Sequence, residues 1–114
     1  MTRIYKILPA VEWEAARQAG RFAGSAVDLA DGYIHFSAAH QALETARRYF
    51  TGQSDLVVLE VDADSLGPEL VWEPSRGGDL FPHLYEPLRC NLVIATRPAP
   101  LGPDGIPNLG ALAP

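Results

Sequence analysis

Two short polar segments, residues 31–37 and 73–85, hold most of the side chains that could carry chemistry. Histidine binds or moves a proton near neutral pH, arginine offers a permanent charge on a planar fork, and tyrosine offers a ring and a hydroxyl. A small domain that concentrates these residue types in two segments is expected to form a cleft there. The candidates are Tyr33, His35 and Ser37 in the first segment and Glu73, Arg76, His83 and Tyr85 in the second.

The first segment is typical of a strand, over residues 33–36, that runs into a helix. Alternation directs Ile34 and Phe36 into the core under that helix, and directs Tyr33, His35 and Ser37 to the opposite side. The helix N-terminus would present free N–H groups to an anion beside His35. We therefore predict His35 as a catalytic residue, and Tyr33 and Ser37 as ligand-binding residues. Two structural roles are the alternatives: a backbone carbonyl can satisfy His35, and Ser37 can be the helix N-cap.

The second segment combines an anion-binding turn with an aromatic loop. In the turn at residues 75–78, two glycines let backbone N–H groups point at an anion, and Arg76 adds its charge. A plain turn with a solvated arginine is the alternative. In the loop, Pro82 restricts the chain before His83, which we predict as a second catalytic residue. Tyr85 would stack on a ligand ring, unless it packs as a lid on the core.

Two further charged residues are candidates for ligand binding. Glu73 ends a strand, where it can pair with Arg76 or act as an acid/base carboxylate. Lys6 has apolar neighbours on its strand face, so its side chain either extends to solvent or reaches the cleft. His35, His83 and Glu73 do not show the spacing of metal ligands, and we predict no metal site.

The composition is that of one folded domain. Of its 114 residues, 47% are hydrophobic and 20% are charged, as in globular proteins. The net charge of −5 argues against broad nucleic-acid binding, although Lys6 and Arg76 leave room for one local basic pocket. No stretch resembles a membrane span or a signal peptide, and the lone Cys90 has no partner for an internal disulfide. We therefore expect a cytoplasmic protein.

The hydrophobic pattern predicts an α+β fold, a single compact domain with a mostly antiparallel sheet of about five strands and two helices. Residues 22–30 and 77–87 show no period and are expected to be irregular. The second helix should pack on the sheet through Ala39, Leu43, Ala46 and Phe50. The strands are expected at residues 3–8, 33–36, 56–61, 70–73 and 91–96, and the helices at 10–19 and 38–50.

Residues 98–114 differ from the rest because prolines alternate with glycines. We divide the chain into an α+β domain at residues 1–97 and this C-terminal tail. The tail is either disordered or an extended strap that docks its large apolar residues on the surface. Because it offers no regular element, we expect the domain to fold without it.

Four stretches of the sequence together resemble the bacterial family known as domain of unknown function 952. They are IYKI at residues 4–7, DGYIHFS at 31–37, WE at 72–73 and FPHLY at 81–85, and the resemblance extends from Arg3 to Pro98. The family implies a compact α+β domain with no established activity. It is more distantly similar to the ADP-ribosyltransferase-like fold, which includes the RNA 2′-phosphotransferases.

The distant similarity implies NAD as a cofactor. In that fold a histidine on an early strand contacts a ribose of NAD, which matches His35, and a later histidine or aromatic residue completes the pocket, which matches His83 or Tyr85. The last strand here lacks the glutamate that many such transferases use, and only Arg76 and Lys6 supply positive charge. The implied function is a transferase for NAD, ADP-ribose or another nucleotide, or a degenerate relative. The alternatives are a non-catalytic module that binds a small anionic metabolite, and a purely structural domain.

Overall fold

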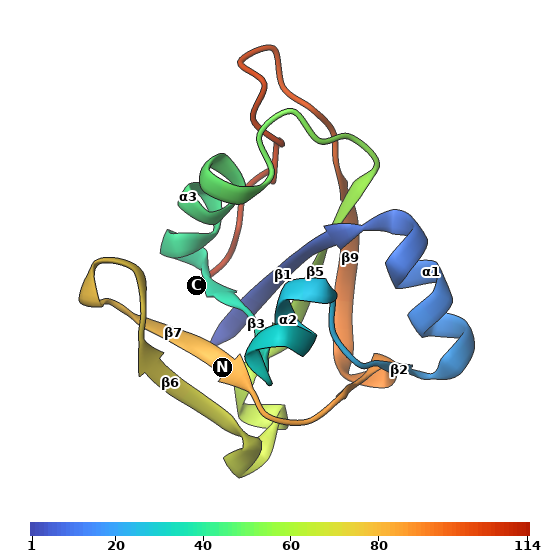
Figure 1. Cartoon of the computed structure of the whole chain (residues 1–114), viewed down its shortest axis with the longest axis vertical. Coiled ribbons are helices and arrows are strands. Elements are labelled where there is room, and N and C mark those ends of the chain that lie inside the picture. Colours follow the sequence, from blue (N-terminus) through green and yellow to red (C-terminus); the bar gives the residue numbers. More distant parts are fainter.

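The computed structural model describes all residues from Met1 to Pro114. Its largest sheet is antiparallel, with the strand order β4 (Ser37–Ala38), β1 (Arg3–Pro9), β5 (Leu56–Asp62) and β9 (Val93–Ala99) (Figure 1). β1 pairs with β5 along its whole length. The apolar, β-branched sequence of β5 favours a strand covered on both faces, and β5 is central in this sheet as predicted.

Two smaller antiparallel sheets complete the fold. One has the order β3 (Ile34–His35), β7 (Leu80–Leu84) and β6 (Leu70–Pro74), and the other pairs β2 (Arg21–Phe22) with β8 (Leu88–Arg89). The prediction of a single sheet of about five strands is therefore wrong, because the strands form three sheets. The predicted α+β class is confirmed.

β7 lies inside residues 77–87, which were predicted to be a loop. Its Pro82 hides the strand in the sequence, because a proline seldom occupies a central strand. The sheet accommodates Pro82 because β3 ends at His35, one pairing earlier. Beyond that pairing, no group of β3 requires an N–H from residue 82. Only the carbonyl of Pro82 is used on the side that faces β3, where it accepts the N–H of Phe36 at 3.0 Å.

Three α-helices lie against the sheets: α1 (Ala10–Ala19), α2 (Ala26–Asp31) and α3 (Ala39–Tyr49). The connections contain the 3₁₀ turns η1 (Ala63–Ser65), η2 (Gly67–Glu69), η3 (Arg76–Gly78) and η4 (Cys90–Leu92). α1 ends at Gly20 as predicted, with a φ of 82° that suits glycine. α2 was predicted to be irregular, because its six residues are too few to show a helical period. None of these helices has the length and apolar character that a membrane crossing requires.

β1 separates two apolar cores. Ile4 and Leu8 pack in the core that contains α1, while Tyr5 and Ile7 pack in the core that contains α3. The division follows the alternation of side chains along a strand.

The predicted packing of α3 is partly wrong. Ala46 is buried as expected, but Leu43 is 61% exposed and Phe50 is only half-buried. Ile34 and Phe36 are buried as expected, yet they belong to the α1 core and do not lie under α3. β4 pairs with β1 just before α3 begins. This pairing places α3 over the face of β1 that carries Tyr5 and Ile7, opposite the face that carries Ile4.

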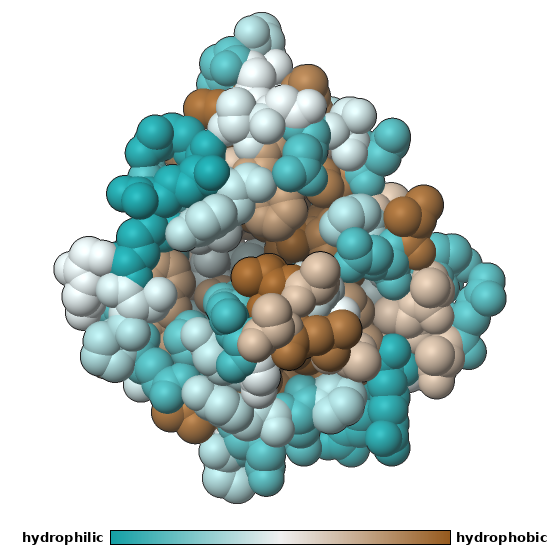
Figure 2. Space-filling view, viewed as in Figure 1, coloured by the Kyte–Doolittle hydropathy of each residue, from teal (hydrophilic) through white to brown (hydrophobic).

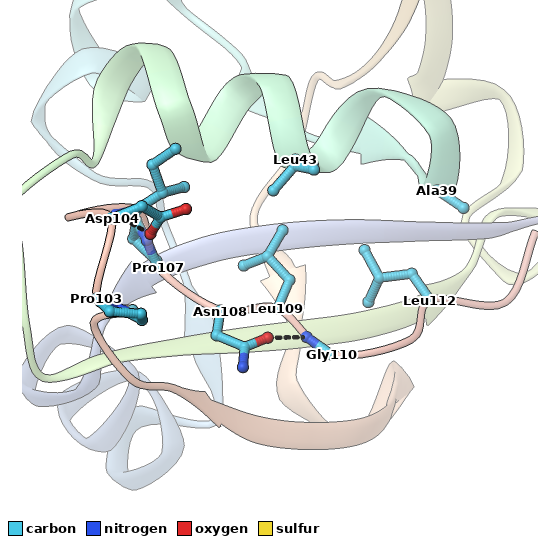
Figure 3. A pocket seen from close by; sticks show the side chains of 11 residues that line it. Ala39, Leu43, Pro103, Asp104, Pro107, Asn108, Leu109, Gly110 and Leu112 are labelled. Atoms are coloured by element: carbon cyan, nitrogen blue, oxygen red, sulfur yellow. Dashed lines mark hydrogen bonds between the residues drawn. The ribbon is translucent and has the colours of Figure 1, made fainter.

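The C-terminal residues form a strap along α3 (Figure 3). Leu109 is buried in the α3 core, and Ile106 and Leu112 pack beside it. The hydroxyl of Tyr5 donates a hydrogen bond of 2.6 Å to the carbonyl of Ala113. Of the two alternatives for the tail, the structure therefore has the docked strap, and a groove of about 440 Å³ lies between it and α3.

Candidate functional site

A pocket of about 600 Å³ is lined by residues of β1, α2, α3 and the turn between β6 and β7. Its volume is typical of a site for a small molecule. Exposed apolar residues of α2 form the brown patch at the centre of the face shown in Figure 2, where Val27 and Leu29 are 57% and 65% exposed. Six predicted site residues line the pocket together: Lys6, Tyr33, His35, Ser37, Arg76 and His83.

The pocket was expected at the N-terminus of α3, but of the residues there only Ser37, just before the N-cap, lines it. Thr45 and Tyr49, from the second half of that helix, line it instead. Ser37 is not the N-cap, because it belongs to β4 and its Oγ lies 2.9 Å from Thr45 Oγ1. Ala38 occupies the N-cap position, and its N–H donates to Gln41 Oε1 at 2.9 Å.

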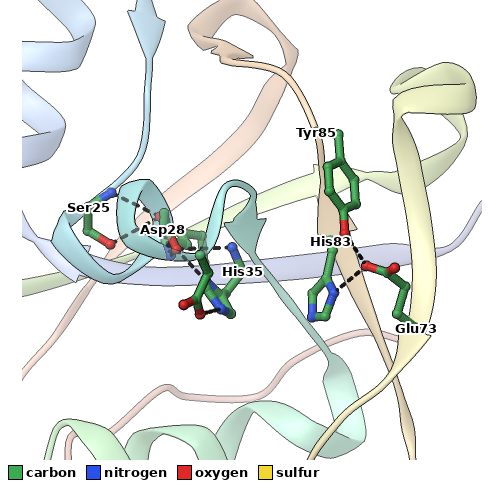
Figure 4. A network of polar contacts seen from close by, with 8 residues as sticks. Ser25, Asp28, His35, Glu73, His83 and Tyr85 are labelled. Carbon is green, nitrogen blue, oxygen red and sulfur yellow. Dashed lines mark hydrogen bonds and ion pairs between the residues drawn. The ribbon is translucent and has the colours of Figure 1, made fainter.

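A buried carboxylate, Asp28, connects α2 to Lys6 of β1 and to His35 of β3, two residues that line the pocket (Figure 4). It is 1% exposed and is the only buried residue of α2. The N–H and hydroxyl of Ser25 donate to it at 2.9 and 3.0 Å, and the backbone N–H of His35 donates at 3.1 Å. Lys6 Nζ lies 3.0 and 2.9 Å from its two oxygens. Lys6 therefore reaches the cleft, as one of its two predicted arrangements required, but with its charge neutralised.

Burial alone would raise the pKa of Asp28. The hydrogen bond from His35, the charge and hydrogen bond of Lys6, and the N–H of Ser25 outweigh burial and hold this pKa well below its ordinary value. Burial lowers the pKa of Lys6, and the charge and hydrogen bond of Asp28 oppose that shift. Asp28 therefore stays ionised at neutral pH and acts as a fixed acceptor for its three neighbours.

His35 lies between two carboxylates. Its Nδ1 is 2.6 Å from Asp28 Oδ1, and its Nε2 is 2.9 Å from Asp31 Oδ2. A carboxylate can only accept, so both ring nitrogens donate when the two hydrogen bonds form together. In this geometry neither nitrogen of His35 is free to take a proton from a ligand. Its catalytic role stays a prediction, and the arrangement favours a positioning role.

His83 has a different arrangement. Its Nδ1 lies 2.8 Å from Glu73 Oε1, and the hydroxyl of Tyr85 donates to the same oxygen at 2.7 Å. No partner contacts its Nε2, and no buried side-chain nitrogen or oxygen in the protein is unpartnered. Since His83 is 3% exposed and lines the pocket, Nε2 opens into it. Glu73 thus holds the Nδ1–H tautomer and leaves Nε2 as an acceptor.

Glu73 therefore pairs with His83 and Tyr85, and the alternative pairing with Arg76 is wrong. Hydrogen bonds from Tyr85 and His83 lower the pKa of Glu73. The hydrogen bond to Glu73 raises the pKa of Tyr85 to about 12, with smaller contributions from burial and from the Glu73 charge. Tyr33 packs among these rings, stacked on His83 with centroids 4.1 Å apart and 5.2 Å from Tyr85.

Arg76 is half-buried in the pocket lining. Its guanidinium lies over the Phe81 ring, 4.7 Å from the centroid, and 3.4 Å from Thr45 Oγ1. No carboxylate lies within salt-bridge distance. Gly77 and Gly78 have φ angles of 71° and 80°, as the predicted glycine turn requires. The turn positions a charge that is free to bind an anion.

The two carboxylates that hold His35 are not among the site residues predicted from the sequence. Asp28 was available from the pattern Ser25-x-x-Asp28, a capping box that predicts a helix start and gives α2 its first turn. Asp31 follows three residues later on the same face. No group of three or more His, Cys, Asp or Glu side chains has an arrangement that could hold a metal ion.

Fold and pocket together define a class of small α+β protein with one histidine-containing cleft. Residues 7–96 match the family described as "Protein of unknown function (DUF952)", and the chain belongs to this family, as its motifs predicted. It is similar to protein CC0527 from Caulobacter crescentus. The crystal structure of CC0527 has a TM-score of 0.91 and 57% identity over 93% of both chains. The solution NMR structure has a TM-score of 0.85 and 57% identity, over 94% of this chain and 92% of that one. No curated protein matches the chain.

Proposed function

We propose that the pocket binds a small nucleotide-type ligand, with NAD and ADP-ribose as the candidates, and that Arg76 holds a phosphate of this ligand. One observation carries the proposal: Arg76 lines the pocket without a carboxylate partner. A guanidinium without a counter-ion attracts anions, and its planar fork fits phosphate. Thr45 Oγ1 lies 3.4 Å from the guanidinium, and Ser37 Oγ lies 2.9 Å from Thr45 Oγ1. The Thr45 hydroxyl donates to the Gln41 carbonyl in this structure and would turn to donate to a phosphate oxygen.

The remaining pocket residues suit the sugar and the base of such a ligand. Tyr33 offers aromatic surface, and His83 Nε2 can accept a hydrogen bond from a ribose hydroxyl. Because Glu73 holds the proton on Nδ1, Nε2 can also take the proton of that hydroxyl as a general base. An acceptor hydroxyl, or water, can take the place of that ribose hydroxyl at Nε2. As Nε2 takes its proton, its oxygen would bond to C1 of the nicotinamide ribose while the bond from C1 to the ring nitrogen breaks and nicotinamide leaves as a neutral molecule, which is the transfer that the ADP-ribosyltransferase-like resemblance implies.

A non-catalytic binding module is the second candidate. The geometry of His35 favours it, because both ring nitrogens are engaged by Asp28 and Asp31. Only one histidine in the pocket is then available for proton transfer. The two candidates share the ligand and differ in whether His83 turns it over.

Thermal-shift measurements test the ligand class. A ligand that binds only the folded protein at about 100 times its Kd adds about 2.7 kcal/mol of stability. We expect ADP-ribose and NAD to raise Tm, and adenosine, which has no phosphate, to have little effect. Arg76→Gln should weaken ADP-ribose binding about tenfold to a hundredfold, as loss of a charged hydrogen bond predicts. Arg89→Gln is the matched control, because Arg89 is exposed on β8 outside the pocket.

Two results would contradict the proposal: equal shifts with ADP-ribose and adenosine, or unchanged ADP-ribose affinity in Arg76→Gln. Turnover separates the candidates. Incubation with NAD, followed by chromatography of the nucleotides, should show products that His83→Gln abolishes while it keeps its ADP-ribose affinity. Binding without any product would favour the binding module.

A further inference from the structure

Two charged side chains in the pocket lining lack a partner of opposite charge, and their signs are opposite. Lys6 forms a salt bridge with Asp28, and both pocket histidines are hydrogen-bonded to carboxylates of the protein. The exceptions are Arg76 and Glu12. Glu12 lies in the first turn of α1, is half-buried, lines the pocket, and forms no hydrogen bond or salt bridge.

Glu12 and Arg76 both line the pocket and come from elements on different sides of the fold. α1 begins at the end of β1, at the right of Figure 1, whereas the β6–β7 turn that contains Arg76 is at the left. Between them, the neutral pair of Lys6 and Asp28 lies on β1 and α2. Glu12 is close enough to act on Lys6: its charge opposes the lowering of the Lys6 pKa that burial causes, after the larger opposing effects of Asp28. The pocket lining therefore carries one positive and one negative side chain without a partner of opposite charge, on separate elements.

From this polarity we infer that the pocket selects bipolar ligands, which present an anion to Arg76 and a cationic group, such as a pyridinium or a protonated amine, to Glu12. The inference rests on the proposed binding of a phosphate at Arg76 and adds the second recognition point. A partly buried carboxylate without a partner in the protein can pair with a charge on a ligand. A cation of the ligand supplies the missing partner and makes Glu12 a specificity-determining residue.

Glu12 also has a structural explanation, because an acidic residue in a first turn interacts favourably with the helix dipole. That effect would contribute to stability only, and would not distinguish a charged ligand from a neutral one. Glu14 is the matched control: it lies on the same helix, 57% exposed, and pairs with Arg17 at 3.0 Å outside the pocket.

Two ligand series test the inference by isothermal titration calorimetry on the full chain. The first compares NAD⁺ with NADH, which differ in the charge of the nicotinamide ring. The second compares ω-aminoalkyl phosphates with ω-hydroxyalkyl phosphates of the same chain length. In each series we expect the cationic member to bind about fivefold more tightly, the equivalent of about 1 kcal/mol. Glu12→Gln should remove this preference, and Glu14→Gln should leave it intact.

The outcomes separate this inference from the proposed function. If the dinucleotides fail to bind but the aminoalkyl phosphates show the Glu12-dependent preference, the nucleotide ligand is wrong and the bipolar selection stands. If both members of each pair bind equally, or if the preference survives Glu12→Gln, the bipolar selection is wrong while the phosphate site stands. If no phosphate-containing probe binds, both are wrong.

Discussion

Replacement of Asp28 by asparagine should be among the most damaging single changes in this protein. Asparagine keeps the shape of the side chain but removes its charge. Lys6, which is 5% exposed, would then have its ammonium group buried without a counter-ion. Breaking a buried ion pair from one side costs about 3–5 kcal/mol. The change would also weaken the hydrogen bond from Ser25, which caps α2, and the hydrogen bond from His35, which connects α2 to β3.

A domain of this size has a total stability of about 5–15 kcal/mol, so Asp28→Asn should consume a large share of it. Each kcal/mol corresponds to about 4 °C in Tm, and we expect Tm to fall by about 12 °C or more. Urea denaturation at neutral pH, monitored by circular dichroism, measures the loss. Asp31→Asn is the control, because Asp31 is exposed and contacts only His35 in the network. A loss of less than about 1 kcal/mol in Asp28→Asn would contradict the role of this ion pair in stability.

A double-mutant cycle shows whether the loss comes from the ion pair. Lys6→Met removes the buried ammonium group, so adding it to Asp28→Asn should restore part of the stability. The double variant should therefore lose clearly less than the sum of the two single variants. Additive losses would mean that Asp28 acts through Ser25 and His35 alone, with no contribution from Lys6.

Three further predictions concern pH, tyrosine ionisation and the strap. The folded-state pKa of Asp28 lies below its unfolded value, so the contribution of the ionised carboxylate to the free energy of unfolding is complete above about pH 4 and is lost as the pH falls further. In an acid titration below about pH 4, the free energy of unfolding should therefore fall more steeply for the wild type than for Asp28→Asn. Glu73→Gln should return the pKa of Tyr85 from about 12 toward its ordinary value, as ultraviolet absorbance against a Tyr85→Phe reference would show, and an unchanged pKa would exclude the Glu73 contact. Removal of residues 101–114 should leave a folded domain that is at least about 1.5–3 kcal/mol less stable, because Leu109 is buried, whereas an unchanged urea midpoint would show that the strap contributes nothing.

The elements with strong periodicity could be predicted from the sequence, and they position the site. The alternation of β1, the helix of α1 up to Gly20, and the opposite orientations of Phe36 and His35 all follow from local pattern. Because these elements form as predicted, six candidate residues from separate segments line one pocket. Pattern could not show the division into three sheets, because strand order depends on pairings between distant segments.

α2 shows why the rest of the site was hidden. Hydrophobic periodicity detects a helix that buries an apolar face. α2 does the reverse: it exposes Val27 and Leu29 and buries only Asp28. A charged residue in a short irregular stretch normally indicates a solvated loop, so its role as a buried anchor emerges only when the partners from β1 and β3 are in place.

The two histidines of the pocket divide its chemistry between them. Each is held by a carboxylate through Nδ1, Asp28 for His35 and Glu73 for His83. The second nitrogen makes the difference, because Asp31 occupies that of His35 while that of His83 has no partner. A ring with both nitrogens engaged can orient its neighbours but cannot accept a proton without first releasing a carboxylate. Any proton transfer in this pocket should therefore pass through His83, and the Asp28 network should serve to hold α2 and His35 in place around it.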